Sequence, residues 1–150
     1  MSGPVYLDPT EAAVLELLSR DIHGPVTMLN LLKLRERADY AEHPMLAPAE
    51  PISGRAAYLR YVEHTLPYLR ASGGELLYLG DGGSYLIGPE HEGWDLAMLV
   101  RQHSLDAFLA FAGNEDYLQG IGHRTAAVHD SRILPLVDCG LARPAGTGDS

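Results

Sequence analysis

The feature that most constrains the fold is an apolar run, Pro-Val-Thr-Met-Leu-Asn-Leu-Leu-Lys-Leu, which extends from Pro25 to Leu34. His-Gly precedes the run and Arg-Glu-Arg follows it, so both ends are clear and the run is too short to span a membrane. Polar and apolar residues do not alternate cleanly along it. This pattern predicts a central β-strand that is buried on both faces.

One polar residue, Asn30, interrupts the run. In a regular strand Asn30 shares a face with Val26, Met28, Leu32 and Leu34, because side chains alternate between the two faces. A buried amide that lacks hydrogen-bond partners loses roughly 1–3 kcal/mol of stability. Asn30 therefore either binds a neighbouring loop or faces a cavity that holds water or a ligand, and we favour the cavity.

Capping residues mark the predicted helices. Asp8-Pro9 begins the first helix, and Ser53 begins the second, which Gly73-Gly74 ends. Ser104 caps a third helix, and a short helix extends over residues 114–121.

Four further segments have the composition of strands. Residues 75–79 and 84–88 are predicted to be two short strands, joined by Gly80-Asp81-Gly82-Gly83 as a hairpin turn. Residues 94–102 form a nearly continuous apolar strand, and residues 125–137 form the last one.

The order of these elements predicts an α+β fold, a ferredoxin-like β-α-β-β-α-β sandwich with an extra N-terminal helix. Apolar residues on both faces of the two central strands require a second layer, and one chain has too few helices to provide it. We expect a second copy to do so, which gives a homodimer whose sheets form an α/β barrel. Residues 1–150 are expected to be one domain, with an ordered core at about 6–137 and a disordered tail at 138–150.

The overall charge limits the class of partner. Twenty acidic and eleven basic residues give a formal net charge of −9, which disfavours nucleic acid and anionic membranes as partners. Cys139 is the only cysteine, so an intramolecular disulfide and a four-cysteine zinc site are excluded. The chain begins without a basic and then apolar leader and has no apolar run of about 18 residues, so we expect a cytoplasmic protein.

Several short motifs, in this order and at this spacing, resemble the domain-of-unknown-function 1330 family. They cover roughly residues 6–136, and each is weak by itself. They are Tyr6-Leu7-Asp8-Pro9-Thr10, Met28-Leu29-Asn30-Leu31-Leu32-Lys33, Tyr58 with Tyr61, Trp94-Asp95-Leu96, Ser104 with Ala107-Phe108, Asp116-Tyr117, His123-Arg124-Thr125-Ala126-Ala127 and Asp130-Ser131-Arg132. His103 is a departure, since similar sequences more often have proline there.

This resemblance implies the dimeric α/β-barrel superfamily. Relatives in that superfamily include cofactor-independent monooxygenases, muconolactone-type isomerases and haem enzymes such as chlorite dismutases. The family itself implies no general activity, so the reaction and the substrate stay open.

The candidate site consists of aromatic and polar residues from these elements. Tyrosines, a tryptophan and an amide around an apolar pocket are typical of sites for small molecules. The predicted substrate-binding residues are Asn30, Tyr58, Tyr61, Trp94, Tyr117 and Arg124, and the predicted proton-transfer residues are His123 and Asp95.

Each of these residues also has a structural interpretation. Tyr58 and Tyr61 lie on the apolar side of their helix, where core packing explains them equally well. Asp95 and Arg124 stand at strand ends, where a salt bridge or a strand cap is the alternative to catalysis. His123 could act as a general base, because histidine titrates near neutral pH. The alternative is a solvated histidine at a helix end.

A long, proline-rich connection follows the first strand, over residues 35–51. Long loops in compact domains are often functional or mobile. Tyr40 and His43 are therefore candidates for lid residues, and two solvated side chains on a loose loop are the alternative.

No cofactor and no metal are expected. The Gly80-Asp81-Gly82-Gly83 stretch opens no helix, so it is not a phosphate-binding loop, and the histidines are too dispersed to define a metal site. A haem ligand among the seven histidines stays an alternative. Two classes of function remain: a cofactor-independent monooxygenase or isomerase that acts on a small aromatic or polyketide-like acid or lactone, and a non-catalytic ligand-binding or structural homodimer.

Overall fold

A computed structural model of the chain describes residues 3–140. Its centre is a four-stranded antiparallel sheet in the order β2-β3-β1-β4. The strands are β1 (Val26–Leu34), β2 (Glu75–Ser84), β3 (Gly93–Gln102) and β4 (Val128–Leu136). The two apolar runs of the sequence form the central strands β1 and β3, as predicted.

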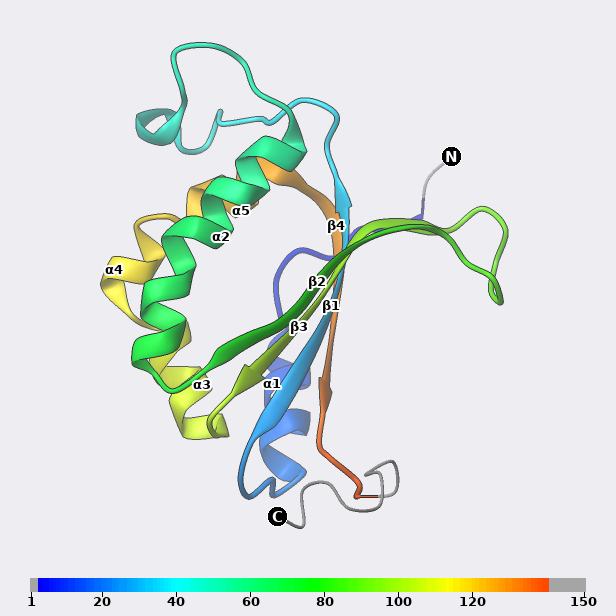
Figure 1. Cartoon of the computed structure of the whole chain (residues 1–150), viewed down its shortest axis with the longest axis vertical. Helices are drawn as coiled ribbons and strands as arrows, with labels where there is room; N and C mark the ends of the chain where they lie inside the picture. The colour runs from blue at the N-terminus through cyan, green and yellow to red at the C-terminus, as the bar shows by residue number, and fades with distance from the viewer. Residues whose placement is uncertain (1–2, 141–150) are drawn as a thin grey trace.

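The helices form a layer on one side of the sheet (Figure 1). This layer consists of α2 (Gly54–Ala71), α3 (Leu105–Ala112), α4 (Glu115–Leu118) and α5 (Ile121–Ala127). An additional helix, α1 (Glu11–Ser19), precedes the first strand, and η1 (Pro44–Leu46) is a single turn in the long connection. The predicted α+β ferredoxin-like fold is therefore confirmed. Most of the predicted tail, residues 141–150, lies outside the described residues.

Helix α2 begins and ends where the sequence predicts. The Ser53 hydroxyl accepts a hydrogen bond from the Ala56 amide at 3.0 Å, which satisfies one free N–H of the first turn. The helix continues through Pro67 and ends at Ser72, and Gly73 then takes a φ of +88° that favours glycine.

The glycine-rich hairpin prediction was wrong. Strand β2 runs through Gly80-Asp81-Gly82-Gly83 to Ser84 and pairs with β3, so the turn lies at residues 85–92. A Cβ atom at Gly82 would lie 2.5 Å from the carbonyl oxygen of Trp94. Glycine is needed there because the two backbones approach closely within the sheet, and not because the chain turns.

The start of the last strand was also predicted wrongly. Residues 125–127 belong to helix α5, and β4 begins only at Val128. Ala126 and Ala127 are fully buried, and α5 packs along α2 at Gly54, where an added Cβ would lie 3.0 Å from the carbonyl oxygen of Ala127. Residues 125–127 are therefore helical because α5 packs closely against α2, although their local sequence favours a strand.

Helix α1 begins two residues later than predicted. Thr10 is the capping residue, and its hydroxyl accepts a hydrogen bond from the Ala13 amide at 3.0 Å. No residue of α1 is buried, so its leucines, among them Leu15 and Leu18, do not pack into the core of this chain.

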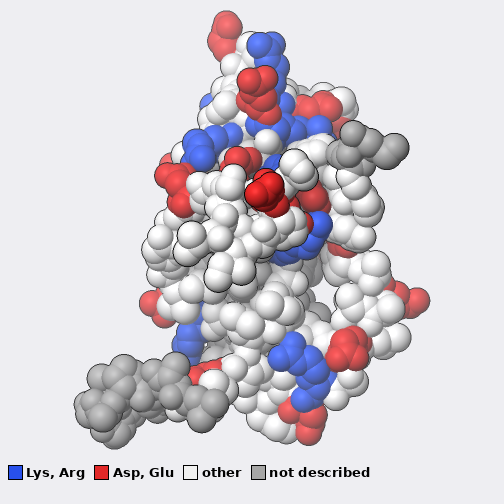
Figure 2. All heavy atoms as spheres, turned by 90° about the vertical axis from the view of Figure 1, so that its right-hand side faces the viewer, with Lys and Arg blue, Asp and Glu red and all other residues white. Residues whose placement is uncertain are grey.

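The side of the sheet away from the helices, here called the open face, is apolar and uncovered. One row of side chains crosses it from β2 to β4, through Tyr78, Leu99, Leu29 and Leu134. Tyr78 and Leu134 are 60% and 55% exposed. Figure 2 looks onto this side and shows a broad uncharged area, with charged side chains gathered mainly above and below it.

The exposure along β1 follows from this open face. Alternate residues, from Val26 to Leu32, are buried under the helices, and the residues between them are half-buried. Within a single chain, β1 is therefore buried on one face and only half-buried on the other, whereas burial of both faces was predicted.

Candidate functional site

His123 and Tyr40 form a hydrogen-bonded pair of titratable groups. The Tyr40 hydroxyl lies 2.8 Å from Nδ1 of His123, and the two rings meet edge to face at 5.6 Å. His123 stands on α5, and Tyr40 lies in the long connection, 83 residues earlier in the chain. Tyr40 is buried, so the interpretation of this residue as a solvated loop side chain was wrong.

The surroundings of this pair favour a neutral imidazole. Burial lowers the pKa of His123 below its ordinary value, and the positive charge of Arg60 and the neighbouring His64 lower it further. Burial raises the pKa of Tyr40, an effect that Arg60 partly offsets. At neutral pH the pair thus holds one uncharged base and one uncharged hydroxyl in contact, which is the state needed for accepting a proton.

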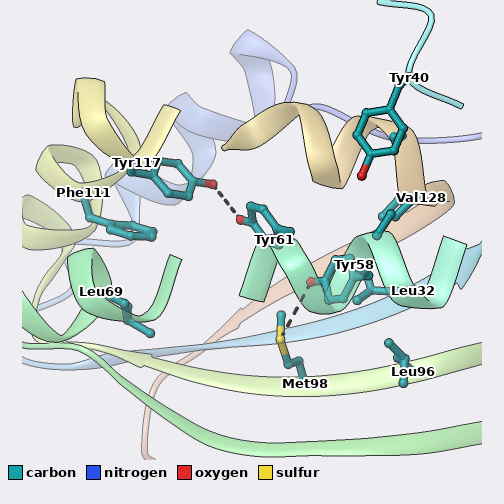
Figure 3. Packing of buried hydrophobic residues seen from close by; sticks show 13 residues of the cluster. Leu32, Tyr40, Tyr58, Tyr61, Leu69, Leu96, Met98, Phe111, Tyr117 and Val128 are labelled. Carbon is teal, nitrogen blue, oxygen red and sulfur yellow. Dashed lines mark hydrogen bonds between the residues drawn. The ribbon is translucent and has the colours of Figure 1, made fainter. Parts of the chain in front are cut away.

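Three of the predicted tyrosines lie together under the helices. The hydroxyl groups of Tyr61 and Tyr117 are 2.7 Å apart, and the Tyr58 hydroxyl donates to the sulfur of Met98 at 3.8 Å. Figure 3 shows that these side chains point toward one another between the helices and the sheet. Burial raises the pKa of both Tyr58 and Tyr117, so both stay protonated.

These tyrosines are closely packed. Ring centroids lie 5.3 Å apart for Tyr58 and Tyr61, 6.1 Å for Tyr61 and Tyr117, and 4.5 Å for Phe111 and Tyr117. Such spacings are those of aromatic pairs in contact, so the rings form part of the core of the chain.

Arg124 connects α5 to the N-terminal segment and to β4. Its guanidinium donates to the carbonyl oxygen of Leu7 at 3.1 Å and to the Ser131 hydroxyl at 3.4 Å. Its positive charge also lowers the pKa of Tyr58 and of Tyr117, against the larger effect of burial. Arg124 therefore lies close enough to Tyr58 and Tyr117 for its charge to affect their ionisation.

Asp95 caps a strand. Its carboxylate accepts a hydrogen bond from the Leu34 amide at 2.7 Å, at the irregularity where the pairing of β1 with β4 shifts. For Asp95 the structure displays the strand-end bond to a backbone amide, whereas Arg124 lies within helix α5 and bonds to a backbone carbonyl oxygen and to a hydroxyl.

Asn30 and Trp94 lie in different surroundings. Asn30 is buried, and its amide nitrogen donates to the carbonyl oxygen of Met28 at 3.1 Å, so at least one partner belongs to its own strand. The indole of Trp94 is also buried and lies under the cations of Arg132 and Lys33, at 4.9 and 5.4 Å. Trp94 thus belongs to a cluster at the base of the β2–β3 connection.

Asp130 anchors this cluster on β4. The Arg132 guanidinium donates to its carboxylate at 2.7 Å, as do the amides of Tyr6 and Ser131 at 2.8 Å each. Burial by itself would raise the pKa of Asp130, but these hydrogen bonds outweigh burial and lower the pKa below its ordinary value.

The long connection contains two adjoining hollows. One has a volume of about 300 Å³ and the other about 240 Å³, and they share Arg37, Pro51 and Ile52. The larger is bounded by Tyr40, and the residues lining the two hollows include none of the eight predicted site residues. The larger hollow therefore lies beside Tyr40, whose hydroxyl contacts His123.

Residues 3–140 contain neither a cluster of metal-ligating side chains nor a membrane-spanning helix. Within this range, no group of three histidine, cysteine or acidic side chains is arranged to hold a metal ion. No helix in the same range is long and apolar enough to cross a membrane.

Sequence reasoning missed the partner of His123. Tyr40 was singled out only as a lid candidate, because nothing in the local sequence links it to a helix more than eighty residues away. His64 was also missed; its Nε2–H donates to the carbonyl oxygens of Asp116 and Tyr117, at 2.9 and 3.1 Å. Its spacing from Tyr61 on α2 is the one local signal that could have placed it near the site.

The fold and this arrangement define an α+β ferredoxin-like protein with a tyrosine- and histidine-containing helical layer. The chain is similar to two crystal structures of the RPA0582 protein of Rhodopseudomonas palustris, a protein of unknown function. The methylated form has a TM-score of 0.80 at 31% identity, over 93% of this chain and 98% of that one. The other structure has a TM-score of 0.77 at 31% identity, over 94% and 100%. The chain belongs to the same family as RPA0582.

A more distant likeness is to a DABB family protein with a ferredoxin-like fold from Mesorhizobium loti, at 11% identity and a TM-score of 0.45, over 77% of this chain and 98% of that one. No family model and no curated protein matches the chain. The similarity to RPA0582 therefore supports the fold of this chain and indicates no activity.

Proposed function

We propose that the chain is a member of the domain-of-unknown-function 1330 family and forms a homodimer of the dimeric α/β-barrel type. The support is the open face, where Tyr78, Leu99, Leu29 and Leu134 form a continuous apolar row across all four strands. A second copy of the same face would remove these side chains from water. Apolar patches of this extent on soluble proteins usually mark interaction sites.

The function that the geometry supports best is proton transfer on a small molecule, without a cofactor. The observation that carries this proposal is the 2.8 Å hydrogen bond between the Tyr40 hydroxyl and Nδ1 of His123, beside a hollow of about 300 Å³. A hollow of this volume suits a small ligand, in the lower part of the range of about 300–1,000 Å³ for such sites.

In this proposal His123 is the base and Tyr40 transfers or holds the proton. The low pKa of His123 keeps its ring neutral and able to accept a proton from a carbon or oxygen acid. Arg37 lines the hollow and would orient a substrate carboxylate or lactone oxygen. The substrate class remains a small aromatic or polyketide-like acid or lactone, with a monooxygenase- or isomerase-type reaction.

A non-catalytic ligand-binding or structural homodimer is the second candidate. It is favoured by the packing of Tyr58, Tyr61 and Tyr117, which fill the space between helices and sheet with rings in mutual contact. In that case the same chain binds a molecule in the connection and does not change it.

Hydrogen isotope exchange separates the two candidates. The protein is incubated in deuterium oxide with a panel of small aromatic acids and lactones, and deuterium at carbon is measured by NMR. We expect exchange with the wild type and a loss of about 10²–10⁴-fold in His123→Gln, the usual contribution of a general base. His129→Gln, at an exposed histidine of β4, is the matched control and should leave exchange unchanged.

Equal exchange rates in His123→Gln and the wild type would refute the assignment of His123. Saturable binding of a panel member without any exchange would support the non-catalytic alternative.

A further inference from the structure

The β2–β3 connection extends beyond the rest of the sheet as an arm. Strand β1 pairs with β3 only as far as Leu32 opposite Leu96, whereas β2 and β3 stay paired to Ser84 opposite Gly93. Residues 81–95, here called the arm, therefore have no strand-pairing partner in β1. In Figure 1 the arm projects to the side of the sheet that carries no helix layer.

The tip of the arm is apolar and lies in solvent. Leu86 is 99% exposed and Ile87 is 89% exposed. Two adjacent aliphatic side chains at the end of a projecting hairpin are unfavourable in water, and among residues 3–140 little packing offsets that cost. The tip therefore has the character of a contact surface.

The base of the arm is held firmly. The Trp94 indole donates to the Tyr85 hydroxyl at 2.7 Å, and that hydroxyl donates to Glu92 at 2.6 Å, so the two sides of the arm are joined. The buried Trp94 ring lies against Arg132 of β4 and Lys33 of β1. An arm fixed in this way loses little conformational entropy when its tip binds a partner.

The area of the open face gives the arm a role in the proposed dimer. Four strands about 4.8 Å apart, paired over about seven residues of 3.3 Å, cover a projected area of roughly 440 Å². Stable interfaces bury about 800 Å² on each partner. The open face by itself supplies only about half of that area, and the arm is the exposed apolar element beside it.

We propose that the arm of each protomer clasps the second copy, with Leu86 and Ile87 buried against the partner. This inference rests on the proposed homodimer and adds to it a second contact region outside the sheet. The occupant is another copy of this chain, because the arm overhangs the face where that copy would sit. Because these contacts fix the base of each arm, and a two-fold axis relates the two copies, the two tips point in opposite directions.

Sedimentation of variants with uncharged substitutions tests the clasp. The test variants are Leu86→Gln and the double variant Leu86→Gln/Ile87→Gln. The matched control is Met45→Gln, at a residue of the long connection that is 95% exposed. We expect the dimer dissociation constant to rise by about tenfold or more per buried side chain, the usual effect of losing a buried leucine or isoleucine from an interface. Met45→Gln should leave that constant unchanged.

A photo-crosslinking residue at position 86 gives an independent measurement. We expect a covalent dimer band from position 86 and none from position 45. The variants should fold normally, since these side chains lie in water in the single chain, and circular dichroism checks this.

The possible failures can be told apart. A monomeric wild type would refute the homodimer and the clasp together. A dimeric wild type, with an unchanged dissociation constant in the double variant and no crosslink from position 86, would refute the clasp alone. The tip would then be free for a different protein or a lipid surface.

Discussion

The hydroxyl pair of Tyr61 and Tyr117 allows a quantitative test of the helical layer. The two oxygen atoms are 2.7 Å apart, and the residues are 9% and 7% exposed. Tyr61→Phe removes one hydrogen bond, about 0.5–1.5 kcal/mol net, and leaves the Tyr117 hydroxyl without this partner, so the loss can reach about 1–3 kcal/mol. The rings stay in place, so the packing is retained.

The reciprocal change, Tyr117→Phe, should have a similar effect, and the double variant should lose much less than the sum of the two. We expect a coupling energy of about 1 kcal/mol, within the range of about 0.5–3 kcal/mol for residues in direct contact. For a chain of this length each kcal/mol corresponds to about 2–4 °C in melting temperature.

Urea unfolding at one fixed protein concentration measures this cycle, because the stability of a dimer depends on concentration. Strict additivity, with the double variant equal to the sum of the single ones, would refute the mutual hydrogen bond.

Three further outcomes follow from the sheet and from helix α5. Gly82→Ala should destabilise by about 1–3 kcal/mol, the range for overpacking, because its Cβ would press on Trp94, whereas Gly83→Ala, with nothing within 4 Å, should be neutral or stabilising in thermal melts. The pKa of Asp130 lies below its ordinary value near 3.9, so its carboxylate contributes stability above that pH and loses it as pH falls through the lower folded pKa. Asp130→Asn should therefore show a smaller drop in stability between about pH 5 and pH 2 than the wild type; equal acid sensitivity would contradict this. The His123 ring, observed by NMR, should titrate below its ordinary pKa of about 6.5, and a midpoint above that value would contradict the account.

Much of the fold could be predicted because its signals are local. The apolar runs of β1 and β3 identify the central strands, and Ser53 marks the start of α2 by the side-chain bond that it makes to its own first turn. The order of elements then leaves few topologies, and the ferredoxin-like one is observed.

The errors arose where tertiary packing overrides local chemistry. Glycines at residues 80–83 are typical of a turn, but here they permit close approach of two strands, which depends on the position of Trp94 across the sheet. Helix α5 contains Gly122 and the β-branched Ile121 and Thr125, yet it packs along α2 with Ala126 and Ala127 fully buried.

The candidate site was predictable only in part for the same reason. Tyr58, Tyr61 and Tyr117 lie together, and Arg124 lowers the pKa of Tyr58 and of Tyr117 against the larger effect of burial. The contact of Tyr40 with His123 joins residues 83 positions apart, so no sequence spacing could have indicated it.

The central claim is that a second copy of the chain covers the open face of the sheet. Sedimentation equilibrium of the wild type at micromolar concentration tests it most directly. The account predicts a mass of about twice the 16.3 kDa chain, and a shift toward one chain mass in Leu99→Lys, a variant in the middle of the apolar row. A wild type that sediments as a clean monomer would contradict the account, because the apolar open face would then have no partner.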